Sequence, residues 1–269
     1  MSHDEVIGLI PAGGLGTRLA PLPCSKELYP IGFRESPGQG GWRPKVVCHY
    51  LLENMRRAGI TKAYIVLRDG KWDIPAYLKS GAIVDMHLSY LVLALPFGAP
   101  FTLDEAYPFI RQSVVAFGFP DMIFQPEDAF SQLRSQQASS DASVLLGLFP
   151  SMEPDKVDMV DIEPDGRVVK IDIKPARTDL TYTWGIALWR PIFSDFMHEY
   201  VSERKSDAAT QPEITVGNVI QAAIEAGLKV DGSPVSTEPY LDIGTSAGLI
   251  LAIQKHCSSS PRASGRNSI

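Results

Sequence analysis

The stretch that decides the fold is LIPAGGLGTRLAPLPCSKELYPIG, which runs from Leu9 to Gly32 near the start of the chain. It begins inside the apolar run Val6–Pro11, whose pattern predicts a buried strand. A glycine cluster directly after a strand lets backbone N–H groups approach a ligand closely. Arg18 and Lys26 follow within a few residues, and cations beside bare amides indicate an anionic ligand.

The composition of the whole chain limits what that ligand can be. The 269 residues allow one large α/β domain or two small ones, and 45% hydrophobic with 21% charged residues is ordinary for a globular protein. The formal net charge is −6, which argues against non-specific binding of nucleic acid. Any anionic ligand must therefore be held by a local positive site.

Targeting and metal-binding patterns are weak in this sequence. No apolar run is long enough for a transmembrane helix, and the N-terminus lacks the features of a signal peptide. Cys24, Cys48 and Cys257 are scattered and odd in number, so we expect reduced thiols in a cytoplasmic protein with no membrane partner. The five histidines show no ligand-pair spacing, so no zinc site is expected.

Strand and helix patterns alternate through the first part of the chain. The expected strands are Val6–Pro11, Ala63–Leu67, His87–Ala94, Val114–Phe119 and Ala142–Phe149, and the expected helices are Val46–Ala58, Ile74–Lys79, Leu103–Ile110 and Glu127–Gln137. This order predicts a Rossmann-like α/β fold, with a mixed, mostly parallel sheet and helices on both faces. Ligands of such sheets bind at the carboxyl ends of the strands, where the glycine cluster and Asp121 would lie.

The pattern changes in the second part. MVDIEPDGRVVKIDIKP predicts two strands joined at Pro164–Gly166, and a further strand is expected over Thr181–Trp189. Helices are expected over Ile192–Glu203, Glu213–Ala226 and Ala247–His256, around a short apolar segment at Tyr240–Ile243. Phe33–Arg43 and Lys205–Gln211 are expected to be surface loops, and Ser258–Ile269 a disordered tail.

The glycine cluster differs from two well-known phosphate-binding motifs. A P-loop needs Gly-Lys-Ser/Thr, whereas Gly16 is followed by Thr17 and Arg18. A dinucleotide fingerprint needs a third glycine where this chain has Leu19, and no clear ribose-binding acid follows the second expected strand. A nicotinamide-dependent oxidoreductase is therefore disfavoured.

Taken together, Gly13–Leu19 and Ser25–Leu28 before Pro30 resemble the signature of the sugar-1-phosphate nucleotidyltransferases, most closely the glucose-1-phosphate thymidylyltransferase type. Further segments resemble this family in the same order: RPKVVCHYLLENMRRAGI, VVAFGFPD, EPDGRVVKIDIKP and YLDIGTSAGLILA. The resemblance implies one nucleotidyltransferase domain over residues 1–257, with a nucleotide-binding half at about 1–150 and a sugar-binding half at about 151–257.

The resemblance also implies the reaction and the residues. A nucleoside triphosphate and a sugar-1-phosphate would give a nucleotide sugar and pyrophosphate, with Mg²⁺ held by Asp121 and Asp242. Arg18, Lys26 and Asp121 would be catalytic. The implied nucleotide-binding residues are Ala12, Gly13, Gly14, Leu15, Gly16, Thr17, Leu93 and Gly98, and those for the sugar phosphate are Asp158, Lys174 and Gly185. A homo-oligomer is left open.

Plainer roles compete with these at individual positions. Arg18 and Lys26 could be solvated surface charges, Asp121 could cap its strand, and Lys174 could merely flank Pro175 on the surface. Asp242 could be a hydrogen-bonded core group, although an unpaired carboxylate in its apolar context would be costly.

Several positions depart from the family pattern, and they fall together. Leu93 stands where the family has a base-reading glutamine, and Ala99-Pro100 where it has a small polar pair. Asp158 replaces a sugar-contacting glycine, Ile173 a glutamate, and Phe119-Pro120 is inserted before Asp121. The residues for phosphate and metal remain, so an active enzyme with altered substrates is favoured. The alternative is a catalytically impaired relative that binds a nucleotide or nucleotide sugar as a sensor or partner subunit.

Overall fold

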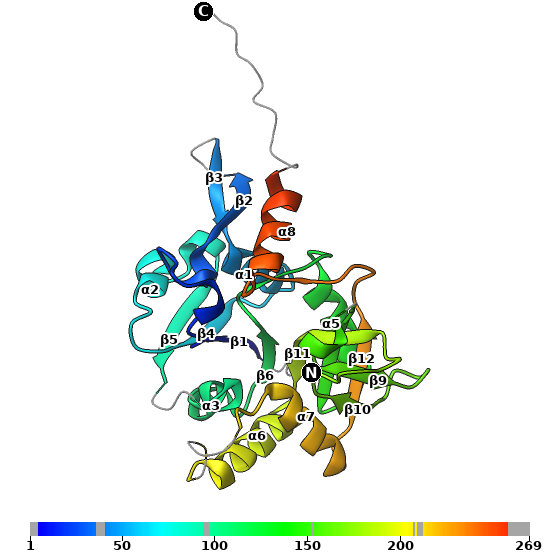
Figure 1. The fold of residues 1–269 in the computed structure, drawn as a ribbon. Coiled ribbons are helices and arrows are strands. Elements are labelled where there is room, and N and C mark those ends of the chain that lie inside the picture. Colours follow the sequence, from blue (N-terminus) through cyan, green and yellow to red (C-terminus); the bar gives the residue numbers. More distant parts are fainter. Residues whose placement is uncertain are drawn as a thin grey trace, which may run out of the picture.

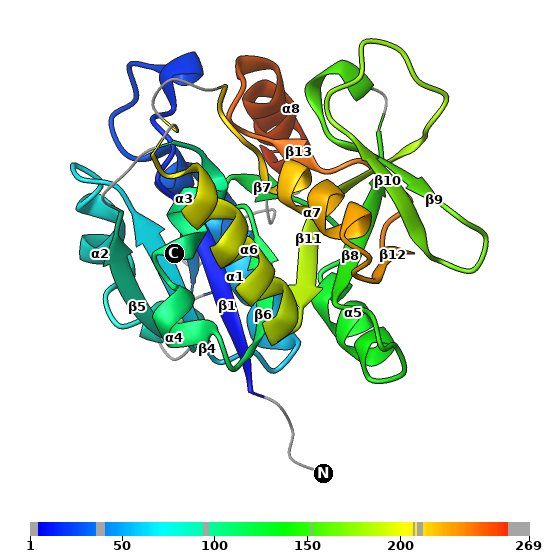
Figure 2. The same ribbon diagram turned by 90° about the horizontal axis from the view of Figure 1, so that it is seen from below.

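The structure is a computed structural model, which describes residues 5–35, 41–93, 97–151, 153–206, 208 and 212–257. Its first half is built on four parallel strands in the order β5 (His87–Val92), β4 (Lys62–Leu67), β1 (Val6–Ala12) and β6 (Val114–Gly118). All five residues of β6 are buried, which fits a central strand covered on both faces. Figures 1 and 2 show these strands side by side.

The second half continues the same sheet. Strand β11 (Tyr182–Trp189) runs antiparallel to β6 and pairs on its other side with β8 (Val144–Pro150) and β9 (Met159–Ile162). The sheet is completed by β12 (Val230–Pro234) beside β8 and by β10 (Val168–Asp172) beside β9. Only β10 and β11 oppose the other strands of this sheet within the described residues, so the predicted mixed, mostly parallel sheet is confirmed.

Helices cover both faces of the sheet, as the alternating pattern predicts (Figures 1 and 2). One apolar core lies under α1 (Val47–Arg57), α2 (Asp73–Leu78) and α5 (Ala129–Gln137). A second core lies under α3 (Ala99–Asp104), α4 (Tyr107–Ile110), α6 (Pro191–Arg204) and α7 (Val216–Glu225). The last helix, α8 (Ser246–Cys257), packs beside a hairpin outside the main sheet. None of the described helices is both long and apolar enough to cross a membrane.

Three sequence-based expectations about local structure were wrong. The expected loop Phe33–Arg43 includes ends of two paired strands, β2 (Pro30–Glu35) and β3 (Trp42–Val46), while residues 36–40 lie outside the described part. The expected helix Leu103–Ile110 is divided between α3 and α4, because Pro108 stands in the first turn of α4 and cannot continue a helix. Helix α7 begins at Val216 rather than Glu213, because Thr215 forms a capping box with Asn218.

Other expectations lie partly or wholly outside the described residues. These are the end of the third expected strand at Ala94, most of the loop Lys205–Gln211 and the tail Ser258–Ile269. The division of the chain into two halves of a single domain stays a prediction.

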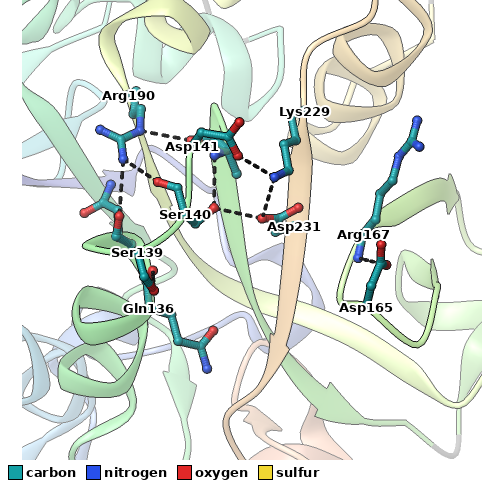
Figure 3. A network of polar contacts seen from close by, with 11 residues as sticks. Gln136, Ser139, Ser140, Asp141, Asp165, Arg167, Arg190, Lys229 and Asp231 are labelled. Atoms are coloured by element: carbon teal, nitrogen blue, oxygen red, sulfur yellow. Dashed lines mark hydrogen bonds and ion pairs between the residues drawn. The ribbon is translucent and has the colours of Figure 1, made fainter.

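A polar network fixes the edge of the sheet at the end of α5, far along the chain from the glycine cluster (Figure 3). Arg190 donates to the backbone carbonyls of Gln137, Ser140 and Ala142 at 3.2, 2.8 and 3.1 Å. Ser140 Oγ donates to Asp231 at 2.8 Å, and Lys229 pairs with Asp141. These contacts anchor β12. The sequence pattern did not indicate this strand, because it contains Gly232 and Pro234, residues that are uncommon inside strands.

Candidate active site

A cleft of about 610 Å³ opens at the carboxyl ends of the parallel strands. Gly13 follows β1, Arg68 follows β4, Leu93 follows β5, and Asp121 comes shortly after β6. The cleft therefore lies where ligands of such sheets bind. Most of the predicted site residues line it: Gly13, Gly14, Leu15, Gly16, Thr17, Arg18, Lys26, Leu93, Gly98, Asp121, Asp158, Lys174 and Asp242.

Two predicted residues do not line the cleft. Ala12 is 1% exposed at the end of β1 and packs in the core. Gly185 lies inside β11, where an added Cβ would stand 2.3 Å from Met122 Cε. The glycine therefore lets β11 and the segment after β6 pack closely.

The glycine turn is shaped around Lys26. Gly16 has a φ of 66°, a conformation that glycine adopts without strain, and it precedes the short helical turn Thr17–Leu19. A Cβ on Gly14 would stand 3.6 Å from Lys26 Nζ, and one on Gly16 would stand 3.8 Å from Lys26 Cδ. The lysine side chain thus extends alongside the turn, and its ammonium reaches the cleft.

Lys26 Nζ forms an ion pair with Asp121 Oδ2, and the two side chains are 13% and 14% exposed. The lysine is carried by the short helical turn Lys26–Leu28, while Asp121 comes from the loop after β6. Burial acts to lower the pKa of Lys26, but the charge and hydrogen bond of Asp121 outweigh it and raise the pKa. The ammonium is therefore held in its charged form.

A two-stranded sheet brings the second predicted metal ligand beside the first. Strand β7 (Met122–Ile123) pairs antiparallel with β13 (Leu241–Asp242), with Asp242 opposite Met122. Ile243 N also donates to the backbone carbonyl of Asp121 at 3.1 Å. Burial, followed by the negative charge of Asp121, raises the pKa of Asp242. The competing role of Asp242 as a core group is not what the structure shows, because its side chain is 41% exposed.

Arg18 and Gly244 complete this end of the cleft. Arg18 Nη2 lies 3.9 Å from Asp242 Oδ2, and Gly244 N donates to Asp242 Oδ1 at 2.7 Å. A Cβ on Gly244 would stand 2.9 Å from Asp242 Oδ1, 3.2 Å from Arg18 Nη2 and 3.4 Å from Asp121 Oδ2. Both carboxylates therefore converge on this glycine. We did not single out Gly244 from the sequence, although its place in YLDIGTSAGLILA was a usable signal.

The opposite end of the cleft is formed by the second half of the chain. Asp158 Oδ2 accepts a hydrogen bond from Thr215 Oγ1 at 3.3 Å, while its Oδ1 is buried without a partner in the described structure. Gly217 makes room for this carboxylate, since a Cβ there would stand 2.2 Å from Asp158 Oδ2. Burial raises the pKa of Asp158, and the charge of Lys174 opposes that rise.

Lys174 has a backbone φ of 44°, in the left-handed region that a side chain rarely adopts. Such conformations persist where the surrounding structure imposes them, often at binding sites. Lys174 lines the cleft and is exposed, as an anion-binding cation would be.

Further residues line the cleft that the sequence did not single out. They are Glu27, Arg68, Thr102, Lys156, Trp184, Glu213 and Tyr240, among others. Arg68, Thr102 and Trp184 stand in no motif, so only the fold could bring them here. Glu27 was visible in SKELYP, but nothing in the sequence showed that it is buried against Lys71.

The residues present fit a magnesium ion. Within the described ranges no group of three or more His, Cys, Asp or Glu side chains is arranged to hold a metal. Two carboxylates nevertheless converge, from Asp121 and Asp242. Mg²⁺ is commonly bound by one or two carboxylates together with substrate phosphates and water, so this pair suits a metal that arrives with a phosphate ligand.

Comparison with known proteins agrees with the fold and with the family that the sequence resembles. A model of the nucleotidyl transferase family matches residues 7–259. The glucose-1-phosphate thymidylyltransferases of Streptomyces griseus and Streptomyces antibioticus are 28% and 24% identical over 85% and 90% of this chain. This chain spans only 60% and 64% of the lengths of those two relatives.

A solved structure of UDP-glucose pyrophosphorylase, complexed with UDP-glucose, has the same fold. It superposes with a TM-score of 0.73 at 17% identity and covers 94% of this chain and 98% of its own. The predicted fold class and the resemblance read from the sequence are thereby confirmed. This chain belongs to the nucleotidyl transferase family.

Proposed function

We propose that this protein transfers a nucleotidyl group from a nucleoside triphosphate to a sugar-1-phosphate and releases pyrophosphate. The observation that carries the proposal is that residues from both halves of the chain line one cleft. One end holds the glycine turn with Lys26, Asp121, Asp242 and Arg18, and the other holds Asp158 and Lys174. A triphosphate and a second phosphorylated substrate could therefore meet in one site.

The glycine turn and its cations would bind the nucleotide. In this reaction an oxygen of the sugar phosphate attacks the α-phosphorus in line, so positioning and charge neutralisation carry most of the catalysis. Backbone N–H groups of Gly14–Gly16 would hold the triphosphate, Lys26 would lie at the α-phosphate, and Arg18 would bind the departing pyrophosphate. Lys174 would hold the phosphate of the sugar substrate, and Asp158 would accept hydrogen bonds from sugar hydroxyls.

Asp121 and Asp242 would hold Mg²⁺. When bound, the ion would neutralise charge on the phosphate oxygens. The converging carboxylates support this assignment, as does the family, whose members generally use a divalent metal.

The relatives support a pyrimidine nucleotide and a glucose-like sugar as the first substrates to test. We also propose a single domain, because one sheet runs through both halves. A cytoplasmic location is proposed because nucleoside triphosphates are available there, and Cys24 and Cys48 are free thiols.

The test is a matrix of nucleoside triphosphates against sugar-1-phosphates, read as pyrophosphate release with Mg²⁺. At least one pairing should turn over, and Asp121→Asn should abolish that turnover. Asp85→Asn is the matched control, since Asp85 is 82% exposed and pairs with Arg56. If no pairing releases pyrophosphate while the protein is folded and still binds nucleotide, the enzyme assignment is wrong and the sensor reading is favoured.

A further inference from the structure

We propose that Arg68 is an additional phosphate-binding residue of this cleft, which holds the terminal phosphates of the triphosphate and the pyrophosphate that leaves. This inference rests on the proposed function and extends it to a residue outside the family-like motifs. Arg68 lines the cleft and is partly buried.

The sheet register places Arg68 beside the glycine turn. Ala12, the last residue of β1, is paired with Leu67, the last residue of β4. The next residues, Gly13 and Arg68, therefore leave neighbouring strands at the same edge of the sheet and both line the cleft. On the other side of β4, Leu93 N donates to the carbonyl of Leu67 at 2.8 Å. Arg68 thus follows β4, which is paired with β1 on one side and with β5 on the other.

Two sets of contacts clamp the loop after β4 to the segment that carries Lys26. Ser25 donates to Asp73 twice, from its backbone N at 2.6 Å and from its Oγ at 2.7 Å. Lys71 Nζ pairs with Glu27 Oε1 at 2.6 Å, and these side chains are 11% and 2% exposed. The residues on both sides of Lys26 are therefore tied to the loop that begins at Arg68, so the two cations are held on one framework.

The charges of the cleft leave Arg68 available for a ligand. Lys26 pairs with Asp121, and Arg18 lies near Asp242, so these four groups cancel one another. A magnesium triphosphate still carries a net charge of about −2. No ion pair or side-chain hydrogen bond joins Arg68 to the part of the chain that the structure describes.

A guanidinium group suits this role because it offers paired N–H donors that match phosphate oxygens. The alternative is a contact with the base, since Leu93, at the family's base-reading position, is joined to Leu67 directly before Arg68. The clamp to the segment of Lys26 favours the phosphates, and a contact with the base is an outcome that the experiment can detect.

The experiment measures binding of inorganic pyrophosphate and of thymidine triphosphate by calorimetry, each with Mg²⁺. We expect Arg68→Met to weaken both by roughly tenfold or more, which is typical for loss of a charge-assisted hydrogen bond. Arg43→Met is the control, because Arg43 is an exposed arginine on β3 and its loss changes the net charge equally. Circular dichroism checks that each variant is folded.

The outcomes separate the two proposals. If the unsubstituted protein binds neither pyrophosphate nor the triphosphate, the proposed function fails and the role of Arg68 fails with it. If the unsubstituted protein binds both and Arg68→Met binds pyrophosphate equally well, only the role of Arg68 is overturned, even if the preference among bases changes. An equal loss of binding in Arg43→Met would also overturn the role of Arg68, because the change in net charge would then explain the effect.

Discussion

Lys26 and Asp121 are 95 residues apart in the sequence, yet the lysine ammonium forms an ion pair with the aspartate carboxylate, and both residues line the cleft. The proposed function assigns one of them to a phosphate and the other to a metal. When substrate binds, Lys26 must therefore leave Asp121 for a phosphate, and Asp121 must leave Lys26 for the metal. Because the pair is largely buried, each separated charge would need that new partner at once.

This exchange predicts competition between Lys26 and the metal. Lys26→Met should strengthen binding of Mn²⁺ alone, by roughly tenfold, since an ammonium no longer neutralises Asp121. Turnover should fall sharply in the same variant. Binding of Mn²⁺ without nucleotide is measured by electron paramagnetic resonance, with Lys62→Met as control because its pair with Glu5 is exposed. Unchanged or weaker Mn²⁺ binding in Lys26→Met would refute the competition.

The two acidic residues should differ in their effect on stability. Asp121→Asn and Asp242→Asn should each abolish Mg²⁺-dependent turnover. Asp121→Asn should also cost about 3 kcal/mol of unfolding free energy, because it leaves a buried ammonium without its counter-charge. Asp242→Asn should leave the unfolding free energy unchanged or slightly raise it, because burial and the charge of Asp121 raise the pKa of Asp242, and its partner Arg18 is 3.9 Å away and 65% exposed. Urea denaturation compares them, and equal costs would contradict this account of the pairs.

His49 on α1 predicts sensitivity to acid. It is fully buried, and neither ring nitrogen has a hydrogen-bond partner in the described structure. Burial, and then the charges of Arg34 and Lys45, lower its pKa to about 3. In the unfolded chain His49 takes up a proton near pH 6.5, whereas the buried ring stays neutral. The contribution of neutral His49 to stability is therefore complete above pH 6.5 and is lost as the pH falls toward 3.

We therefore expect His49→Phe to flatten the loss of stability between pH 6.5 and 4. At pH 7 the free energy of unfolding of the variant should be about 1 kcal/mol higher than that of the parent, because no buried ring nitrogen is then left unpaired. A phenyl ring keeps the packing on Tyr77, whose ring centroid lies 5.7 Å away. Melting temperatures across this pH range are the measurement. A variant with the same pH profile as the parent would show that other groups control acid unfolding.

The parts of the fold that the sequence predicted are those with local signals. Strand β1 and the glycine turn follow from periodicity and from the needs of a close backbone approach. The hairpin arms β2 and β3 were missed because their apolar positions are few and a Pro/Gly-rich stretch separates them. The pairing of β7 with β13 involves two residues on each side, too few for any sequence pattern.

The site divides in the same way. Arg18, Lys26, Asp121 and Asp242 could be named because they stand in or next to motifs. Arg68 could not, because only the parallel register of β1 and β4 brings the end of β4 to the cleft. Gly217 could not either, since its role depends on Asp158, which lies just before β9 and packs against α7.

Asp158 should lower the stability of the fold and contribute to binding of the sugar phosphate. Burial raises its pKa, so ionisation is harder in the folded protein than in the unfolded chain, and ionised Asp158 lowers the stability of the fold. Asp158→Asn should therefore melt at a higher temperature than the parent at pH 7, and the advantage should shrink as the pH falls through the raised pKa and vanish below about 3.9, the pKa of Asp in the unfolded chain. The same variant should raise KM for the sugar phosphate but leave KM for the triphosphate unchanged. A lower melting temperature at pH 7 would contradict the penalty.

Leu93 should make selection of the base weak. It is 9% exposed and packs against Gly13, where an added Cβ would stand 2.5 Å from Leu93 Cδ2. Strong discrimination comes from buried polar groups that the wrong partner leaves unpaired, and a leucine side chain has none. Thymidine and uridine triphosphates present the same hydrogen-bonding edge and differ by a methyl group and a ribose hydroxyl. The methyl group is worth roughly 1 kcal/mol, or about a tenfold preference at most.

The measurement is kcat/KM for each triphosphate with the parent and with Leu93→Gln. The parent should show less than about a tenfold preference between the two pyrimidines. The variant should discriminate more strongly against purines, because an amide at this position can pair with one base edge and is left unpaired by another. Leu15→Gln is the control, since Leu15 also lines the cleft but is 67% exposed. Water can satisfy a glutamine amide at such a position, so a missing hydrogen bond to the base costs little there. A parent that strongly prefers one pyrimidine, or that prefers a purine, would mean that backbone groups or other side chains of the cleft read the base or the ribose.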